Sequence, residues 1–233
     1  MTSLDDRAAI DALRQCPLFA PCPEGVLADV GRRLRHRHFR RNEVIFHQGD
    51  PGDALHVITS GSVKIVLPST EGEEAIIATL RGGDFFGELS LLDGEPRSAT
   101  AVAVEATETL SLPRDVFREL LDQHPELRDA LFAALTQLLR RLTHHVEELH
   151  FLDLAGRLAA RLAQLARHAR PGTDGPVELD WPYTQSDLAA MIGGTRQSVN
   201  RLLADLIADG LVRVEHERLI VTDVHALERR ADR

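Results

Sequence analysis

The spacing of hydrophobic residues changes twice along this chain. In residues 3–35 they recur at helical intervals, and a Pro-containing stretch at 17–23 interrupts them, which predicts short helices. Residues 43–112 instead contain short β-rich runs such as VIF, LHVI and VKIVL, separated by turn-forming segments such as QGDPGD and SGS. Several short strands at this spacing predict an antiparallel barrel or roll.

A helical period returns after these runs. Residues 114–124 predict one helix, and a long helix is expected to follow Pro125, from about residue 126 to 148 or beyond. The segment FLDLAGRLAARLAQLARHA predicts a further helix, which ends before the Pro- and Gly-rich stretch at 171–176.

Leucines repeat along one stripe of the predicted long helix. The stripe consists of Leu135, Leu138, Leu142, Leu149 and Leu152, with His145 at the remaining position of the heptad pattern. Such a stripe predicts a coiled-coil dimer interface. The alternative is a stripe that packs against its own domain, because three heptads are few for a coiled coil.

Length and composition narrow the class of protein. The 233 residues suffice for two modest domains. The chain has no apolar run of about 18 residues and no secretory signal at its start, so we expect a cytoplasmic protein without a membrane partner. Cys16 and Cys22 are too few for a disulfide framework or a four-thiolate cluster, so we expect free thiols.

Residues 86–99, FGELSLLDGEPRSA, place two charged residues among glycines and apolar residues. Gly87 allows close backbone approach, and SLL predicts a short helix whose free N–H groups face an anion. The guanidinium of Arg97 suits phosphate oxygens, with Ser98 as a further donor. The carboxylate of Glu88 suits a ribose hydroxyl. This pattern predicts a sugar-phosphate site, and the alternative is a structural ion pair between the two charges.

A second group of residues lies at 184–206. Thr184 and Thr195 are placed to cap two helices, and Gly193 and Gly194 permit a sharp turn between them. Apolar residues of the second helix predict a buried face. The other face of this helix carries Arg196, Gln197, Asn200 and Arg201, and these four residues and the two capping threonines are the expected DNA contacts. This is helix-turn-helix geometry, and LVRVEHERLIVTD predicts a two-stranded wing after it.

Net charge does not by itself indicate nucleic-acid binding. The chain carries a net charge of −9, and from Ala169 to the end it has 8 Lys and Arg against 11 Asp and Glu. Binding to double-stranded DNA must therefore rest on the local helix face, where Arg suits guanine and Gln suits adenine. The alternative is an ordinary helical hairpin with solvated arginines.

The segment FGELSLLDGEPRSATA resembles the phosphate-binding cassette of cyclic nucleotide-binding domains. The resemblance implies that Glu88 binds the ribose 2′-hydroxyl and Arg97 the cyclic phosphate, with help from Gly87, Leu89 and Ser98. It also implies that the long helix closes over the base. That helix has Leu142 and Thr143 where relatives commonly use two small polar residues to contact adenine, so Thr143 matches and Leu142 departs.

The helix-turn-helix and the order of all parts resemble the CRP/FNR family of transcription regulators. In that family Arg, Glu and Arg stand at the positions of Arg196, Gln197 and Arg201, so Gln197 departs and the preferred half-site is expected to differ there. The resemblance implies a homodimer on a two-fold symmetric operator, controlled allosterically by a cyclic nucleotide, with cyclic AMP (cAMP) the expected ligand. RNA polymerase is a further expected partner.

The resulting expectation is an α+β fold in three parts. Residues 1–125 form a jelly-roll-like β-roll that binds the nucleotide, residues 126–152 a long dimerisation helix with a hinge, and residues 153–233 a winged helix-turn-helix domain.

Other functions remain open at this point. No catalytic set is evident, because Ser90 and Ser98 lack a base and the 11 histidines show no zinc spacing, so we expect neither an enzyme nor a metal site. The same DNA-binding switch could respond to cyclic di-GMP, to a gas bound by a haem on His47 or His56, or to no ligand.

Overall fold

The computed structural model describes residues 4–71, 73–170, 172–173, 175–179, 184–215 and 218–231. It divides into two compact units, residues 1–140 and residues 141–233, which we describe separately. This division falls inside the long helix, so the three-part division expected from the sequence stays a prediction. Within the described ranges no helix is both long and apolar enough to cross a membrane.

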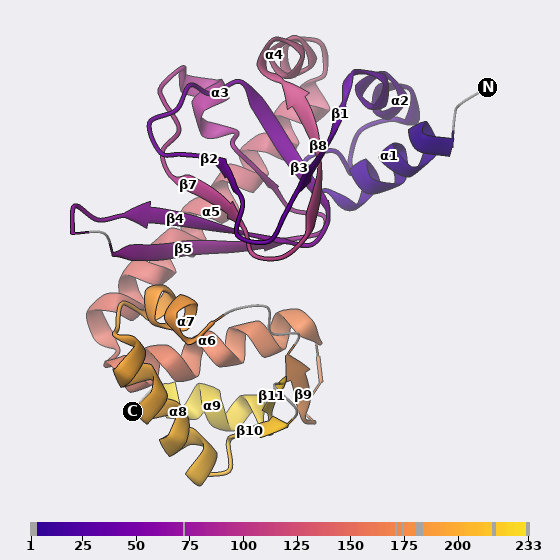
Figure 1. The fold of residues 1–233 in the computed structure, drawn as a ribbon. Helices are drawn as coiled ribbons and strands as arrows, with labels where there is room; N and C mark the ends of the chain where they lie inside the picture. Colours follow the sequence, from indigo (N-terminus) through magenta and orange to yellow (C-terminus); the bar gives the residue numbers. More distant parts are fainter. Residues whose placement is uncertain are drawn as a thin grey trace. The chain divides into compact units, whose positions relative to one another are not determined.

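The first unit is a β-roll with helices packed against it (Figure 1). Its helices are α1 (Leu4–Gln15), α2 (Glu24–Arg33), α3 (Leu89–Asp93), α4 (Arg114–Gln123) and the first part of α5 (Pro125–Phe151). Its strands are β1 (Arg35–Phe39), β2 (Val44–Phe46), β3 (Ala54–Ser60), β4 (Ser62–Pro68), β5 (Glu74–Arg81), β6 (Phe85–Phe86), β7 (Thr100–Ala103) and β8 (Thr107–Pro113). They form antiparallel sheets of order β1-β8-β3-β6 and β2-β7-β4-β5, which confirms the predicted roll.

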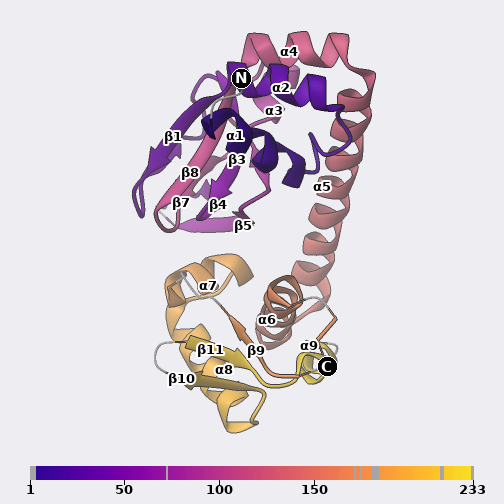
Figure 2. The same ribbon diagram turned by 90° about the vertical axis from the view of Figure 1, so that its right-hand side faces the viewer.

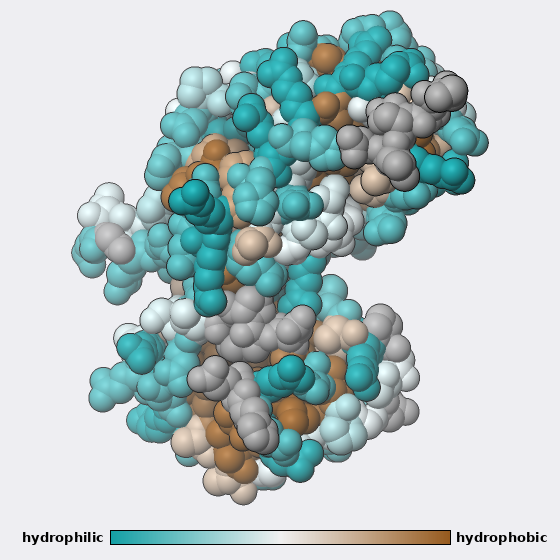
Figure 3. All heavy atoms as spheres, turned by 45° about the vertical axis from the view of Figure 1, so that its right-hand side comes forward, coloured by the Kyte–Doolittle hydropathy of each residue, from teal (hydrophilic) through white to brown (hydrophobic). Residues whose placement is uncertain are grey.

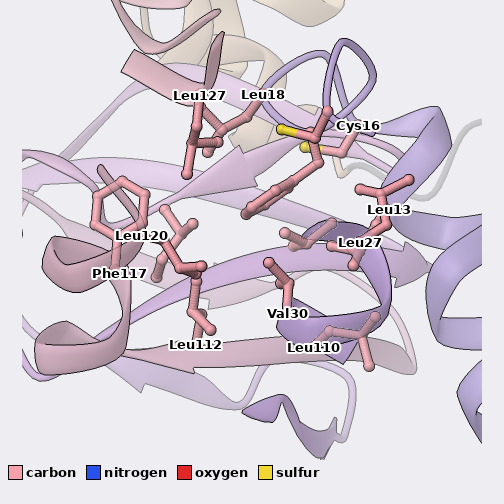
Figure 4. Close-up of a cluster of buried hydrophobic side chains, with 14 of the residues drawn as sticks. Leu13, Cys16, Leu18, Leu27, Val30, Leu110, Leu112, Phe117, Leu120 and Leu127 are labelled. Carbon is pink, nitrogen blue, oxygen red and sulfur yellow. The ribbon is translucent and has the colours of Figure 1, made fainter. Parts of the chain in front are cut away.

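Strand β3 lies between two hydrophobic cores because its side chains alternate. Leu55 and Val57 join the larger core, which is built with the helices, whereas Ile58 joins the core between the two sheets. Figure 4 shows Leu13, Val30 and Phe117 of the larger core among the helices and strand β8. The sheet that contains β3 thus packs against helices on one face and against the second sheet on the other.

Both cysteines lie in the larger core and are free, as predicted. Burial raises the pKa of Cys16 to about 12 and that of Cys22 to about 11. Both thiols therefore remain protonated at neutral pH, and they act as small apolar side chains.

The second unit is a winged helix-turn-helix (Figure 2). After the end of α5 it contains α6 (Leu154–Ala169), β9 (Val177–Leu179), α7 (Gln185–Ile192), α8 (Arg196–Ala208), β10 (Val212–Glu215), β11 (Arg218–Val221) and α9 (Val224–Ala231). The strands form an antiparallel sheet of order β10-β11-β9. Together with the β-roll and the long helix, this arrangement confirms the predicted α+β fold class.

The sequence patterns identified no separate run for β1, β6, β8, β9 or α9. Strand β1 reads RHRHF and has no apolar alternation, since it is an edge strand with four of its five residues exposed. Strand β9 has only three residues, too few for a recognisable period.

The exposed apolar residues of α5 follow a different register from the predicted stripe. The large ones are Phe132, Leu139, Leu142, Val146 and Leu149, which we call the exposed stripe, and Phe151, which lies outside it. Leu142 and Leu149 are common to both patterns, whereas Leu138, His145 and Leu152 are half-buried. Leu135 packs against the larger core of the first unit.

Most of the surface visible in Figure 3 is hydrophilic, with smaller hydrophobic patches. This matches a chain in which 27% of residues are charged.

Candidate ligand site and nucleic-acid interface

The guanidinium of Arg97 lies inside the first unit, with the residue only 3% exposed. Its Nη1 donates to the carbonyl oxygen of Gly87 at 2.7 Å and to Oγ of Ser90 at 3.1 Å. Its Nη2 donates to the carbonyl oxygen of Ala54 at 2.8 Å and to Oδ1 of Asp53 at 3.1 Å. Its Nε is buried and has no hydrogen-bond partner. The guanidinium is therefore held rigidly, with one donor left over.

The loop at residues 47–53 fixes the backbone of Arg97. Its amide donates to the carbonyl oxygen of Asp50 at 2.8 Å, and its own carbonyl oxygen accepts from the amide of Gly49 at 2.9 Å. The ring of Phe46 lies 4.2 Å from the guanidinium carbon, in a cation–π contact. The acidic turn QGDPGD thus builds one wall of the site.

Gly87 is required where the cassette meets the arginine. Its φ of +86° lies in the region that other residues rarely adopt, and a Cβ there would stand 2.6 Å from Nη1 of Arg97. The glycine therefore permits the close contact between the two ends of the cassette.

The buried positive charge of Arg97 carries a desolvation cost. Burial lowers the pKa of Arg97, and the carboxylates of Asp53, Glu88 and Asp50 act against this. The side chain of Asp53 is 87% exposed, so the counter-ion of the guanidinium lies on the solvent side. An anion that enters from solvent therefore competes with the carboxylate of Asp53 for the guanidinium of Arg97.

The remaining cassette residues lie around the same point. Glu88 is 8% exposed and precedes α3, where its carbonyl oxygen accepts from the amides of Leu91 and Leu92. Leu89 and Ser98 are exposed. The cassette therefore combines two buried charged residues with exposed neighbours.

Leu142 and Thr143 both lie in the second unit and are exposed. Their predicted contact with the nucleotide base therefore stays a prediction.

The haem alternative meets a structural obstacle at His56. Its ring stacks on that of Phe86 with a centroid distance of 5.1 Å, and its Nδ1 lies 3.2 Å from Oγ1 of Thr109. Burial, with a smaller effect from the charge of Arg97, lowers the pKa of His56 to about 4. This imidazole is neutral, only 7% exposed and part of an aromatic cluster. His47 is exposed.

The first helix of the helix-turn-helix begins and ends as predicted. Thr184 and Asp187 form a capping box, in which the amide of Asp187 donates to Oγ1 of Thr184 at 3.1 Å and the amide of Thr184 donates to Oδ2 of Asp187 at 2.8 Å. Gly193 ends α7 with a φ of +68°. Thr195 then caps α8, since its Oγ1 accepts from the amide of Ser198 at 3.1 Å.

Helix α8 buries one face and exposes the other. Val199, Leu203 and Leu206 are buried. The six residues predicted to contact DNA are all exposed, namely Thr184, Thr195, Arg196, Gln197, Asn200 and Arg201. The strands β10 and β11 follow as a wing, in which Arg218 pairs with Glu178 of β9. The surface has the shape and donor set of a major-groove reader.

Comparison with known proteins assigns both units. The profile described as "Cyclic nucleotide-binding domain" matches residues 36–124, and that described as "Crp-like helix-turn-helix domain" matches residues 156–230.

Related proteins match over nearly the whole chain. The "CRP-like cAMP-activated global transcriptional regulator" of Mycobacterium tuberculosis is 32% identical over 221 residues, which cover 95% of this chain and 99% of the relative. The "Cyclic AMP receptor protein" of Thermus thermophilus is 35% identical over 195 residues, which cover 84% of this chain and 87% of the relative.

A solved structure shares the fold. It is that of the "c-di-GMP Responsive Global Regulator CLP" of Xanthomonas campestris, with a TM-score of 0.71 at 24% identity, covering 86% of this chain and 99% of that one. With its two domains and their order, the chain belongs to the CRP/FNR family, a family of DNA-binding transcription regulators rather than enzymes, and carries a cyclic nucleotide-binding domain.

Proposed function

We propose that the protein is a homodimeric transcription regulator whose DNA binding is controlled allosterically by a cyclic nucleotide, with cAMP the expected ligand. The observation that carries this proposal is the buried guanidinium of Arg97, whose Nε lacks a partner inside the phosphate-binding cassette. An unpaired buried donor is costly, and a phosphate oxygen is a strong acceptor for it. The names of the two relatives support cAMP as the ligand.

Each cassette residue has a role in this proposal. Arg97 and the hydroxyl of Ser98 donate to the cyclic phosphate, and the carboxylate of Glu88 accepts from the ribose 2′-hydroxyl. The backbone of Gly87 and Leu89 lies close to the sugar phosphate. A cyclic phosphate also supplies negative charge to the buried guanidinium, whose ion pair with the exposed Asp53 has a distance of 3.1 Å.

Cyclic di-GMP is the second candidate ligand, because it offers the same phosphate and ribose groups. Leu142 stands where a small polar residue is expected for adenine, and CLP is named for its response to cyclic di-GMP. The proposed base contacts are those of Thr143 and Leu142.

The exposed stripe on α5 favours association with a second copy. Phe132, Leu139 and Val146 repeat every seven residues, and Leu142 and Leu149 alternate with them in steps of three and four. Three of these side chains are more than 60% exposed, which is unusual for apolar residues unless a partner covers them. We therefore place the seam of the proposed dimer on this stripe instead of on Leu138, His145 and Leu152.

The DNA contacts and their control follow from this dimer. Two α8 helices would read half-sites about 34 Å apart, through Arg196, Gln197, Asn200 and Arg201. The capping threonines Thr184 and Thr195 hold the two helix starts that face the phosphates.

The nucleotide acts only if it binds the DNA-competent arrangement of the dimer better than the other arrangement. RNA polymerase is the proposed further partner, and the cytoplasm the proposed location.

Calorimetric titration with cAMP, cyclic GMP and cyclic di-GMP tests the ligand proposal. We expect saturable binding of a cyclic mononucleotide, one per subunit, with affinity falling at least about 100-fold in Arg97→Lys because a rigid donor fork is replaced by a point charge. Ser98→Ala, which removes one exposed hydroxyl, serves as the milder control. Retained affinity in Arg97→Lys, or binding of cyclic di-GMP alone, contradicts the proposal for cAMP.

A further inference from the structure

A groove of about 410 Å³ lies in the second unit between the end of α5, helix α6 and helix α9. The most buried of its lining residues are small, namely Ala163 on α6 and Ala231 on α9, and Ala160 lines it one turn before Ala163. Phe151, the last residue of α5, and Leu152, which follows it, form an apolar wall. This volume lies in the range of pockets that hold small organic molecules. None of these residues belongs to the proposed nucleotide or DNA sites.

The polar part of the groove is acidic. It contains the carboxylates of Glu147, Glu148 and Glu228 and one guanidinium, that of Arg167. Arg167 is already neutralised, because its Nε and Nη2 donate to the two carboxylate oxygens of Glu228 at 3.0 and 3.1 Å. Three carboxylates and one guanidinium leave a formal charge of −2 when His144 is neutral. The groove therefore favours a cation over an anion.

An aromatic ring stands next to the two remaining carboxylates. Phe151 follows Glu147 by four residues and Glu148 by three, so the three side chains share one face of α5. Phe151 is 77% exposed, and an organic cation at the carboxylates can also contact its ring face. His144 lies 3.5 Å from Glu147 and 3.4 Å from Glu148, and His145 lies 3.6 Å from Glu148.

The groove does not compete with the proposed dimer seam. If Phe132, Leu139 and Val146 are a positions of a heptad and Leu142 and Leu149 are d positions, the α5 residues of the groove fall at b, c and f. The b, c and f positions point away from a coiled-coil partner. The groove is thus open to solvent in a dimer built on the exposed stripe.

We propose that this groove binds a small organic cation with an apolar body, such as a protonated or quaternary amine. The cationic group lies between the carboxylates of Glu147 and Glu148 and the ring of Phe151, and the apolar body fills the hollow over Ala160 and Ala163. Such a ligand contacts α5, α6 and α9 together, so it holds the helices on both sides of the joint between α5 and α6. This inference does not depend on which cyclic nucleotide the first unit binds.

Three probes with the same apolar body and different charge test the proposal on the full chain. They are 1-adamantylammonium, 1-adamantanol and 1-adamantanecarboxylate, compared by calorimetry and by ligand-observed NMR. We expect the ammonium to bind about tenfold more tightly than the carboxylate, with the alcohol between them, as expected for contacts with one exposed carboxylate, one half-buried carboxylate and one aromatic ring.

Two variants locate the binding. The double variant Glu147→Gln, Glu148→Gln should remove the preference for the cation while the alcohol still binds, and Ala160→Leu should weaken all three probes by filling the hollow. Glu71→Gln, an exposed charge change in the first unit, is the matched control and should change nothing. Phe151→Ala at an exposed position replaces Ala160→Leu if that variant has a lowered melting temperature.

Three results would overturn the proposal. The first is the absence of saturable ammonium binding at millimolar concentration. The second is carboxylate binding equal to or tighter than that of the ammonium. The third is ammonium binding that the groove variants leave unchanged, which would place the cation elsewhere.

Discussion

The two units use arginine in opposite ways. Arg97 of the first unit is 3% exposed, and protein groups already satisfy most of its donors before any ligand arrives. Arg196 and Arg201 of the second unit are exposed on one face of α8. A buried, fixed guanidinium recognises one small anion through geometry, whereas exposed arginines adapt to a long polyanion and depend on salt. The same residue type thus serves a selective pocket in one unit and a reading surface in the other.

The same contrast applies to apolar residues, since the β-roll buries them and α5 exposes a stripe of them. Replacing Leu139 by Glu should break the proposed dimer most strongly, because two-fold symmetry places both new carboxylates in one apolar seam. We expect the dimer dissociation constant to rise at least about 100-fold in analytical ultracentrifugation. Gln137→Glu, which adds the same charge on the opposite side of α5, should leave the dimer intact. A stable Leu139→Glu dimer would contradict the assigned seam.

The exposed arginines can be tested by the ratio of specific to non-specific DNA binding. Arg196→Ala should lower affinity for the operator by about 1–3 kcal/mol, the usual cost of losing a bidentate base contact. Affinity for random DNA should fall much less. Arg213→Ala in the wing is the control, since this side chain is exposed and paired with Glu215 at 3.5 Å. An equal loss on operator and random DNA would make Arg196 a phosphate contact.

Asp53→Asn tests whether Asp53 competes with the cyclic phosphate for the buried Arg97. The variant removes the competitor of the cyclic phosphate, so nucleotide affinity should rise about fivefold, a small effect because Asp53 is 87% exposed. Calorimetry measures this change, and Glu95→Gln, an exposed charge change in the same cassette, is the control. A fall in affinity would show that Asp53 positions Arg97 for the ligand and does not compete with it.

The sequence sufficed for features that depend on local chemistry. The caps at Thr184 and Thr195, the turn at Gly193 and the buried face of α8 follow from spacing along one helix pair, and all were predicted. The pairing of Arg97 with Asp53 was not predicted, because 44 residues separate them and only the fold brings them together.

The register of the exposed stripe on α5 also depends on the tertiary fold and did not follow from the local sequence. Leucines occupy several faces of this helix, so periodicity alone supports more than one stripe. The burial of each residue in the structure distinguishes these stripes, since Leu135 packs on the core while Leu139 and Val146 are exposed. Strand β1 was missed for a related reason, because an exposed basic edge strand carries no apolar signal.

In the proposed function, a nucleotide bound in the first unit controls the affinity of the second unit for DNA. The most direct measurement is the affinity of the full-length protein for an operator, selected from random DNA in the presence of cAMP, measured with and without cAMP by fluorescence anisotropy. We expect cAMP to tighten operator binding at least about fivefold, as expected for allosteric coupling, and Arg97→Lys to lose this response while keeping its basal DNA affinity. Equal affinity with and without nucleotide in the wild-type protein would contradict the proposed function.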